Sequence, residues 1–233
     1  MRTAAILPVK SFARAKQRLS ASVEDSLRLA LAGAMVGDVL AALAATEAIT
    51  ATYVVTREPQ AAEAALASGA SVIEDGSESG QSEAVALGVR RALADGFQRV
   101  LCVPGDCPAL DSAELAALLS DHGVRGAEVV ILPDRHGTGT NGLLLTPPGA
   151  IEPSFGPGSC ERHVSLAAAA GIACRVEPIP SLMLDIDTGD DLAALREALS
   201  RLDGRAPRTR AALGEPAAHP RGHKQAAPLA GHS

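Results

Sequence analysis

The sequence predicts an α/β fold with three layers and a mostly parallel sheet. Short apolar runs alternate with longer helical runs along most of the chain, and this alternation is typical of right-handed βαβ units. The length of 233 residues suits one such domain. Hydrophobic residues make up 47% of the chain but aromatic residues only 2%. We therefore expect a core of Ala, Leu and Val with close packing between helices and sheet.

The predicted strands are short apolar runs that end at turn residues. They cover residues 3–9, 49–56, 71–74, 99–103, 128–132, 139–146, 172–177 and 182–186. Predicted helices cover residues 22–45, 59–68, 111–122, 161–170 and 188–202, and one more follows the polar loop 75–83 and ends near residue 94. From residue 204 the composition shifts to Ala, Pro, Arg, His and Gly without periodicity. We therefore expect one domain, residues 1–203, and a disordered tail, residues 204–233.

Charge and hydropathy argue against several classes of function. The net charge of −6 disfavours nonspecific binding of nucleic acid, which needs a basic face. No apolar run approaches the roughly 20 residues of a membrane span, and the start of the chain lacks the apolar segment of a signal peptide. We therefore expect a cytoplasmic protein without a membrane partner. Four cysteines lack the paired spacing of a zinc site, namely Cys102, Cys107, Cys160 and Cys174.

One carboxylate stands at the predicted carboxyl end of the central strand. The apolar run 99–103 breaks at Pro104 and Gly105 and is followed by Asp106. Ligands of open α/β sheets bind outside the carboxyl ends of the strands. Asp106 is therefore a candidate for holding a metal ion and, through it, a phosphate. The alternative is an Asp that only forms a turn or caps the next helix.

A second acidic cluster supports the metal hypothesis. Asp185 and Asp187 flank Ile186 at the end of the predicted strand 182–186. A period of two places both carboxylates on the same side, roughly 6–7 Å apart along the strand. Like charges so placed repel each other unless a cation lies between them. Together with Asp106 they could bind one or two Mg²⁺ ions, which prefer oxygen ligands and substrate phosphates.

A cationic loop follows the first predicted strand. Four cations fall within nine residues there, namely Lys10, Arg14, Lys16 and Arg18. At the end of a strand they could surround a triphosphate, although a solvated basic loop is the alternative. Neither the P-loop pattern nor G-x-G-x-x-G is present. Phosphates would therefore be bound by side-chain charge and metal rather than by a glycine cradle.

Two glycine-rich loops add hydrogen-bond donors. Residues 137–142 offer closely spaced backbone N–H groups and hydroxyls, and Gly156, Gly158 and Ser159 do so just before a helix. Each loop alone could be an ordinary turn. Together with the acids and the cationic loop they describe a site for two phosphate-bearing substrates bridged by metal, which implies phosphoryl or nucleotidyl transfer.

Five motifs in this order resemble one family, the 2-phospho-L-lactate/phosphoenolpyruvate guanylyltransferases of coenzyme F-420 biosynthesis. They are Leu7-Pro8-Val9-Lys10 with Ala15-Lys16-Gln17-Arg18-Leu19, Gly105-Asp106-Cys107-Pro108-Ala109-Leu110, Arg135-His136-Gly137-Thr138-Gly139-Thr140-Asn141, Phe155-Gly156-Pro157-Gly158-Ser159, and Asp185-Ile186-Asp187-Thr188. The resemblance covers about residues 3–200. It implies a Rossmann-like nucleotidyltransferase fold, similar to that of nucleotide-diphospho-sugar transferases. The implied reaction joins GMP from GTP to a phosphorylated three-carbon acid, phosphoenolpyruvate or 2-phospho-L-lactate, and releases diphosphate.

The resemblance also implies roles for individual residues. Mg²⁺ would be held by Asp106, Asp185 and Asp187, and the phospho-acid would contact Thr140, Gly156 and Ser159. The GTP phosphates would be bound by Lys10, Lys16 and Arg18, with Arg14 nearby. We expect Asp106, Lys16 and Lys10 to be catalytic.

One motif departs from the family pattern. The family typically has Leu-Asn-Xaa-Ala near the nucleotide base, and here Gln81-Ser82-Glu83-Ala84 takes that place. Ser82 is therefore the candidate at the base, and the strictness of the guanine preference is left open. Because a phosphate monoester is already ionised at pH 7, no general base is needed, and His136 and His163 are given no catalytic role.

Two alternatives to this function remain from the sequence. One is a nucleotidyltransferase for a molybdopterin or sugar phosphate, although such enzymes usually have a Gly-rich loop after the first strand, where Pro8-Val9-Lys10-Ser11 stands here. The other is a non-catalytic nucleotide-binding module. The oligomeric state is also open, with a homodimer as one option.

Overall fold

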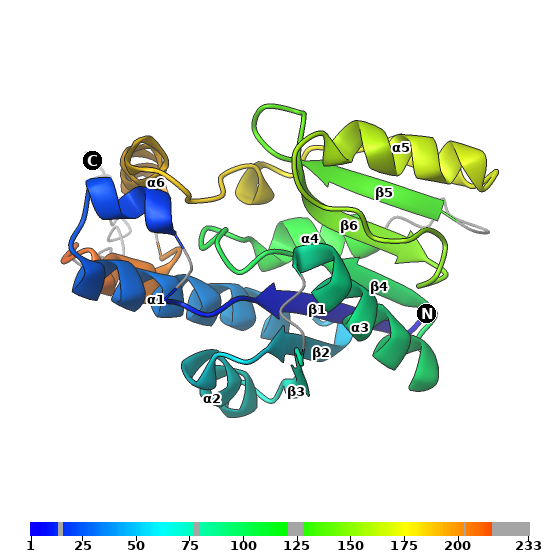
Figure 1. Ribbon diagram of the computed structural model, residues 1–233, viewed down its shortest axis with the longest axis horizontal. Coiled ribbons are helices and arrows are strands. Elements are labelled where there is room, and N and C mark those ends of the chain that lie inside the picture. Colours follow the sequence, from blue (N-terminus) through cyan, green and yellow to red (C-terminus); the bar gives the residue numbers. More distant parts are fainter. Residues whose placement is uncertain (14–15, 77–79, 121–127, 203, 216–233) are drawn as a thin grey trace, which may run out of the picture.

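The computed structural model is an α/β sandwich in which helices cover both faces of one sheet (Figure 1). It describes residues 1–13, 16–76, 80–120, 128–202 and 204–215. The sheet has seven strands in the order β3-β2-β1-β4-β6-β5-β7. Their bounds are β1 Thr3–Val9, β2 Ile49–Thr56, β3 Ser71–Glu74, β4 Arg99–Cys102, β5 Glu128–Pro133, β6 Thr140–Thr146 and β7 Ala173–Val176.

The sheet is mostly parallel, as the sequence predicts. β1 pairs in parallel with β2 and with β4, and β2–β3 and β5–β7 are also parallel pairs. β6 runs antiparallel to both of its neighbours. Because β1 and β4 are adjacent and parallel, their carboxyl ends lie side by side at the centre of the sheet, where ligands bind in open α/β folds.

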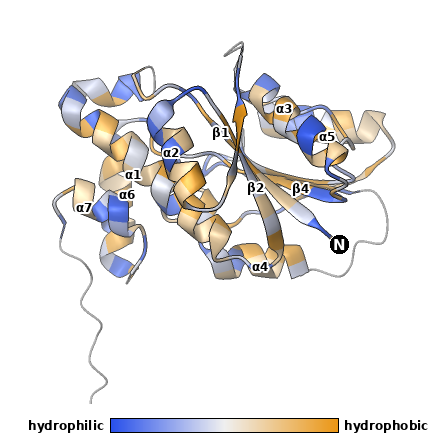
Figure 2. Cartoon of the chain, turned by 90° about the horizontal axis from the view of Figure 1, so that it is seen from below, coloured by the Kyte–Doolittle hydropathy of each residue, from blue (hydrophilic) through white to orange (hydrophobic). Residues whose placement is uncertain are grey.

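The helices form the two outer layers. α1, α2 and α4 pack on one face of the sheet, while α3 and α5 pack on the other (Figure 2). A third apolar cluster joins α1 to α6 beyond the edge of the sheet. The bounds are α1 Asp25–Ala44, α2 Pro59–Ala67, α3 Gln81–Ala94, α4 Ser112–Ser120, α5 Ser159–Ala169, α6 Gly189–Arg201 and α7 Pro207–Ala212, with short 3-10 helices η1 Gln17–Ala21 and η2 Pro180–Leu182.

The predicted strand 182–186 is wrong. The chain there forms the end of η2 and then an irregular segment that crosses the carboxyl end of β4, where the N–H of Ile186 donates to the carbonyl of Asp106 at 3.2 Å. Ile186 is fully buried in the apolar cluster between α1 and α6. The apolar residues of this run therefore pack against helices, which a strand-like pattern cannot distinguish from a sheet position.

The predicted tail also needs correction at its start. Residues 207–212 form α7, which packs on α1. Asp38, buried on α1, accepts hydrogen bonds from the backbone N–H groups of Arg208 at 3.1 Å and Thr209 at 2.8 Å. Six helical residues are too few to show a periodic pattern, so the sequence did not reveal this helix. The rest of the predicted tail, residues 216–233, lies outside the described residues.

α1 is more apolar than the sequence analysis recognised. It has 20 residues and a mean hydropathy of 1.7, enough by length and composition for a membrane span. Half of that stretch is buried inside the protein, and its buried residues include the charged Arg28 and Asp38. The core helix of a soluble protein meets the same criterion, so this feature is weak evidence for a membrane span.

Candidate active site

A cleft opens where β1 and β4 end. Its volume is about 320 Å³, and its walls come from the loop after β1, the loop after β4, and the start of α3. The predicted site residues among its lining are Lys10, Lys16, Asp106 and Asp187. The cleft thus combines cations and carboxylates at the sheet position that the sequence predicts.

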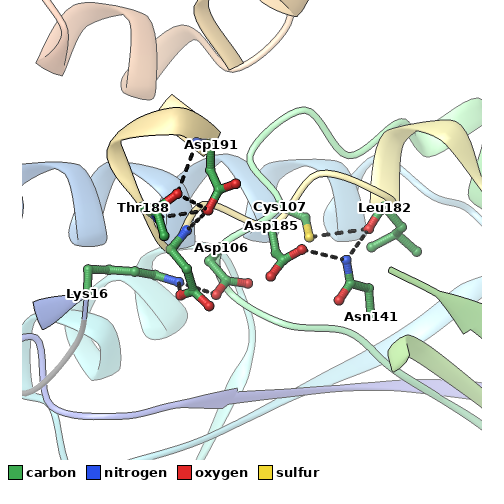
Figure 3. Close-up of polar contacts among 9 residues, drawn as sticks. Lys16, Asp106, Cys107, Asn141, Leu182, Asp185, Thr188 and Asp191 are labelled. Carbon is green, nitrogen blue, oxygen red and sulfur yellow. Dashed lines mark hydrogen bonds and ion pairs between the residues drawn. The ribbon is translucent and has the colours of Figure 1, made fainter. Parts of the chain in front are cut away.

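Lys16 connects the acids at the floor of the cleft. Its ammonium binds the carboxylate of Asp106 and lies 2.7 Å from Oδ1 of Asp187 (Figure 3). Only 9% of the Lys16 side chain is exposed. Burial by itself lowers the pKa of Lys16, but the two carboxylates outweigh it and leave that pKa raised, so the group stays charged. Lys16 has a left-handed backbone with φ of 57°, which L-residues rarely adopt.

Asp185 is held by a different partner. The Nδ2 atom of Asn141 donates to the carbonyl of Leu182 at 2.7 Å and to Oδ1 of Asp185 at 3.2 Å (Figure 3). In the pairing of β6 with β5, Thr140 and Gly142 face consecutive residues, so Asn141 is the extra residue of a β-bulge. Burial raises the pKa of Asp185; the bond from Asn141 opposes this effect, and the charges of Asp106 and Asp187 add to it.

The three predicted metal ligands are brought near one another but do not form a ready-made metal site. No three His, Cys, Asp or Glu side chains are grouped as metal ligands in the part of the chain that the structure describes. Because residues 183–188 are irregular rather than a strand, the period of two that predicted a same-side pair does not apply to Asp185 and Asp187. Asp187 contacts Lys16, whereas Asp185 contacts Asn141.

The donor set nevertheless fits a divalent cation. Oδ1 of Asp106 is buried and has no hydrogen-bond partner among the described residues. Lys16 already places a positive charge between Asp106 and Asp187. Carboxylate oxygens are the ligands that Mg²⁺ prefers. The acids could therefore hold a metal ion if the Lys16 ammonium moved from between them.

Asp191 has a positioning role beside the site that the sequence analysis did not predict. It is buried at the start of α6, and its Oδ2 accepts the backbone N–H of Asp187 at 3.0 Å and of Thr188 at 2.8 Å. The Thr188 side chain completes a capping box, and Arg135 forms an ion pair with Asp191. Burial alone would raise the pKa of Asp191, but these donors outweigh it and lower that pKa. Asp191 thereby fixes the backbone that carries Asp187.

The hydroxyl of Thr140 contacts His163. The Thr140 Oγ1 and His163 Nδ1 atoms are 3.0 Å apart, and both residues are buried. The other ring nitrogen, Nε2, accepts the backbone N–H of Ser154 at 2.9 Å. Burial, aided by the charge of Arg162, lowers the pKa of His163 to about 4, so the ring is neutral near pH 7.

The second glycine loop leads into α5 as predicted. Gly156 and Gly158 have φ of 110° and 69°, which a residue with a Cβ would adopt only with strain. Ser159, the first residue of α5, is 1% exposed, and its hydroxyl has no partner among the described residues. The guanidinium of Arg162 donates to the carbonyls of Ser154, Phe155 and Pro157 and thus fixes the backbone of the loop that precedes α5.

The first glycine loop is less available than predicted. Oδ1 of Asp134 accepts the backbone N–H groups of His136 at 3.1 Å and Thr138 at 3.0 Å. The N–H of Gly137 donates to the Asp134 carbonyl at 3.1 Å. These amides are used within the loop, so the predicted anion-binding role is not supported for them.

The remaining predicted nucleotide contacts differ in position. Lys10 lines the cleft, whereas Arg18 is exposed on η1 and is not part of the cleft lining. Arg14 lies outside the described residues. The Ser82 hydroxyl accepts the backbone N–H of Phe155 at 2.9 Å, and its neighbour Gln81 lines the cleft instead.

Solved structures share this fold. A nucleotidyl transferase from Methanothermobacter superposes with a TM-score of 0.63 at 20% identity and covers 86% of this chain and 98% of that one. A Desulfovibrio desulfuricans protein assigned as a nucleotide-diphospho-sugar transferase reaches a TM-score of 0.74 at 19% identity, over 92% and 95% of the two chains. The predicted fold is confirmed, and it is the fold of nucleotidyltransferases.

Sequence relatives specify the family. The family model described as "Guanylyl transferase CofC like" matches residues 3–199, and the chain belongs to this family of nucleotidyltransferases. The phosphoenolpyruvate guanylyltransferase of Conexibacter woesei is 48% identical over 92% of this chain and 96% of its own length. The enzyme of the same name from Rubrobacter xylanophilus is 38% identical over 82% and 92%.

Proposed function

We propose that this protein transfers GMP from GTP to phosphoenolpyruvate or to the related 2-phospho-L-lactate and releases diphosphate. The observation that carries the proposal is the junction of Lys16 with Asp106 and Asp187 at the floor of a cleft at the sheet centre. The names of the relatives favour phosphoenolpyruvate. Following the family resemblance, we place the step in coenzyme F-420 biosynthesis in the cytoplasm, where both substrates are small soluble anions.

The nucleotide would occupy the cleft beside β1. Lys10 and Lys16 line it near the acids, and their positive charge suits the triphosphate. Gln81, at the start of α3, lines the cleft as well, and we assign it to the end that holds the base. The cationic side chains would then stabilise the departing diphosphate, whose negative charge increases as it leaves.

The acids would hold Mg²⁺. We assign Asp106, Asp185 and Asp187 as its ligands, because Oδ1 of Asp106 has no partner among the described residues and carboxylate oxygens are the ligands that Mg²⁺ prefers. Bound there, the ion would screen the charges of the two phosphates. Lys16 would turn from the carboxylates to the nucleotide phosphates when the substrates bind.

The phospho-acid would bind between β6 and α5. We assign Thr140, Gly156 and Ser159 to this subsite, since the Ser159 hydroxyl is buried without a partner among the described residues and lies at the N-terminus of α5. A phosphate oxygen of the acid attacks the α-phosphorus of GTP, and the bond from that phosphorus to the bridging oxygen of diphosphate breaks. The attacking oxygen is already ionised at pH 7, so the site needs positioning and charge rather than a general base.

Diphosphate release tests this proposal. The purified protein is assayed with Mg²⁺ and GTP against phosphoenolpyruvate, 2-phospho-L-lactate and 3-phosphoglycerate, with ATP and CTP in place of GTP as controls. We expect turnover with GTP and one of the first two acids, and none with Asp106→Asn, whose far-UV circular dichroism should match that of the unchanged protein. No diphosphate with any pair of substrates, or near-normal activity of Asp106→Asn, would refute the assignment.

A further inference from the structure

We propose that His163 is a positioning residue that makes the Thr140 hydroxyl a hydrogen-bond donor toward an anionic oxygen of the phospho-acid. The inference rests on the proposed function and adds a specificity determinant to it. The direction of the Thr140 hydroxyl decides whether this subsite can donate a hydrogen bond to a carboxylate or phosphate oxygen of the substrate.

The hydrogen-bond partners of the ring select its tautomer. The backbone N–H of Ser154 donates to Nε2 of His163 at 2.9 Å, so Nε2 carries a lone pair and no hydrogen. In the neutral ring the single hydrogen is therefore on Nδ1. Nδ1 lies 3.0 Å from Oγ1 of Thr140, and in this tautomer Nδ1–H donates to that oxygen.

The tautomer in turn sets the direction of the Thr140 hydroxyl. A hydroxyl has one hydrogen to donate, and with Nδ1–H as its partner Oγ1 accepts on that side and keeps its own hydrogen for another acceptor. Ionised carboxylate and phosphate oxygens only accept hydrogen bonds. In the opposite tautomer Thr140 would donate to His163 and would present only lone pairs to an anionic substrate.

The surroundings hold the ring in this position. His163 is fully buried, and its ring meets Phe155 edge to face with centroids 5.3 Å apart. Ser154, which supplies the selecting N–H, is itself fixed because its carbonyl accepts from the Arg162 guanidinium at 3.0 Å. The loop that contains Gly156 thus also supplies, through the N–H of Ser154, the hydrogen bond that selects the tautomer of His163.

A second observation points to a ligand beside this pair. Ser159 lies four residues before His163 on α5, so the two side chains share one face of the helix. The Ser159 hydroxyl is buried and has no partner among the described residues, although buried hydroxyls are nearly always hydrogen-bonded. A carboxylate or phosphate group of the substrate would be an acceptor for both hydroxyls.

Substitutions of His163 separate this role from a purely structural one. His163→Leu removes both ring contacts, while the side-chain amide of His163→Asn can take the place of Nδ1 as a donor to Thr140. We expect His163→Leu to raise the KM for the phospho-acid about 10-fold with the KM for GTP changed less than about 2-fold. His163→Asn should recover most of the loss. Ser165→Asn, on the exposed side of α5, is the matched control and should behave as the unchanged protein.

Two further measurements cover variants that fold poorly. The imidazole ¹⁵N shifts of the unchanged protein at pH 7 report the tautomer directly, and we expect hydrogen on Nδ1 of His163; hydrogen on Nε2 would overturn the inference.

Thr140→Val should raise the KM for the phospho-acid, and adding His163→Leu to it should cause no further increase. Equal rises in both KM values, or an unchanged KM for the acid in His163→Leu, would contradict the inference while leaving the proposed transfer intact. Calorimetry with phosphoenolpyruvate, Mg²⁺ and GTP distinguishes failure of the inference about His163 from failure of the proposed transfer. If the unchanged protein binds no acid, the inference and the proposed transfer are both refuted.

Discussion

The Nζ atom of Lys16 lies 2.7 Å from Oδ1 of Asp187, a residue 171 positions further along the chain. The same ammonium binds Asp106, whose other carboxylate oxygen has no partner among the described residues. A protein cation thus pairs with two acids at the place where the proposed reaction needs a divalent cation. In the proposed reaction, substrate binding would exchange this contact for metal and phosphates.

Replacing Lys16 should affect metal binding and turnover in opposite directions. Lys16→Met removes a cation that competes for the carboxylates, so we expect Mg²⁺ to bind about 10-fold more tightly in the absence of nucleotide. Turnover should fall about 100-fold, because the variant lacks the charge that stabilises the diphosphate. Calorimetric titration with Mg²⁺ and diphosphate release measure the two effects. Arg90→Met, which removes an exposed cation from α3, is the control. Mg²⁺ affinity that stays constant or weakens in Lys16→Met would show that the lysine does not compete with the metal.

The sheet and one half of the site could be predicted from sequence. The strands at 3–9, 49–56 and 71–74 match to the residue, because each is an apolar run bounded by polar or turn residues. Asp106 was placed at the carboxyl end of the central strand for the same reason. Lys10 and Lys16 follow β1, which pairs in parallel with β4, so the pairing brings the loop after β1 to the same end of the sheet as Asp106.

The other half depends on contacts that periodicity does not encode. The run 182–186 looks like a strand, but Ile186 packs against helices, and the position of Asp185 depends on Asn141 at a bulge of β6. His163 lacks a sequence signal, because nothing in α5 marks it as the neighbour of Thr140. Asp191 did have one: Thr188 and Asp191 have the spacing of a capping box, which marks a buried and fixed start of a helix.

Asp191 should matter for both stability and catalysis. Asp191→Asn weakens the bonds to the backbone of Asp187 and Thr188 and leaves Arg135 without its carboxylate partner. We expect a loss of about 1–2 kcal/mol in the free energy of unfolding and about a 10-fold fall in kcat, since Asp187 is no longer held in place. Urea unfolding and diphosphate release measure these effects. Asp190→Asn changes the exposed neighbour in the same helical turn and should alter neither by more than a small fraction. Equal losses of stability and kcat in Asp191→Asn and Asp190→Asn would mean that only the negative charge of the first turn of α6 matters.

Ser82 should couple the two substrate subsites. Its hydroxyl accepts the N–H of Phe155, so the start of α3 is tied to the loop that precedes α5. Ser82→Ala leaves that half-buried amide without its acceptor, and we expect about a 5–10-fold rise in the KM for the phospho-acid. The ratio of GTP to ATP turnover should change little, because Gln81 rather than Ser82 lines the cleft. Steady-state kinetics with both nucleotides test this, with Glu83→Ala on the exposed side of α3 as the control. A selective loss of GTP preference would instead assign Ser82 to the base.

His163 should make the stability of the fold depend on pH below neutrality. Its folded pKa is lowered to about 4, chiefly by burial, whereas an unfolded histidine titrates near 6.5. As the pH falls from about 6.5 to 4, His163 is protonated in the unfolded chain but not in the folded chain, so the free energy of unfolding decreases. Below about pH 4 the residue is protonated in both states, and the free energy of unfolding decreases no further on its account. The decrease should reach about 3 kcal/mol. Urea unfolding at pH 7 and pH 4.5 should therefore show a steeper fall for the unchanged protein and for Ser165→Asn than for His163→Asn, which has no ring to protonate. Identical slopes in all three proteins would show that His163 takes up its proton over the same pH range in the folded and unfolded chains, so that burial does not lower its pKa.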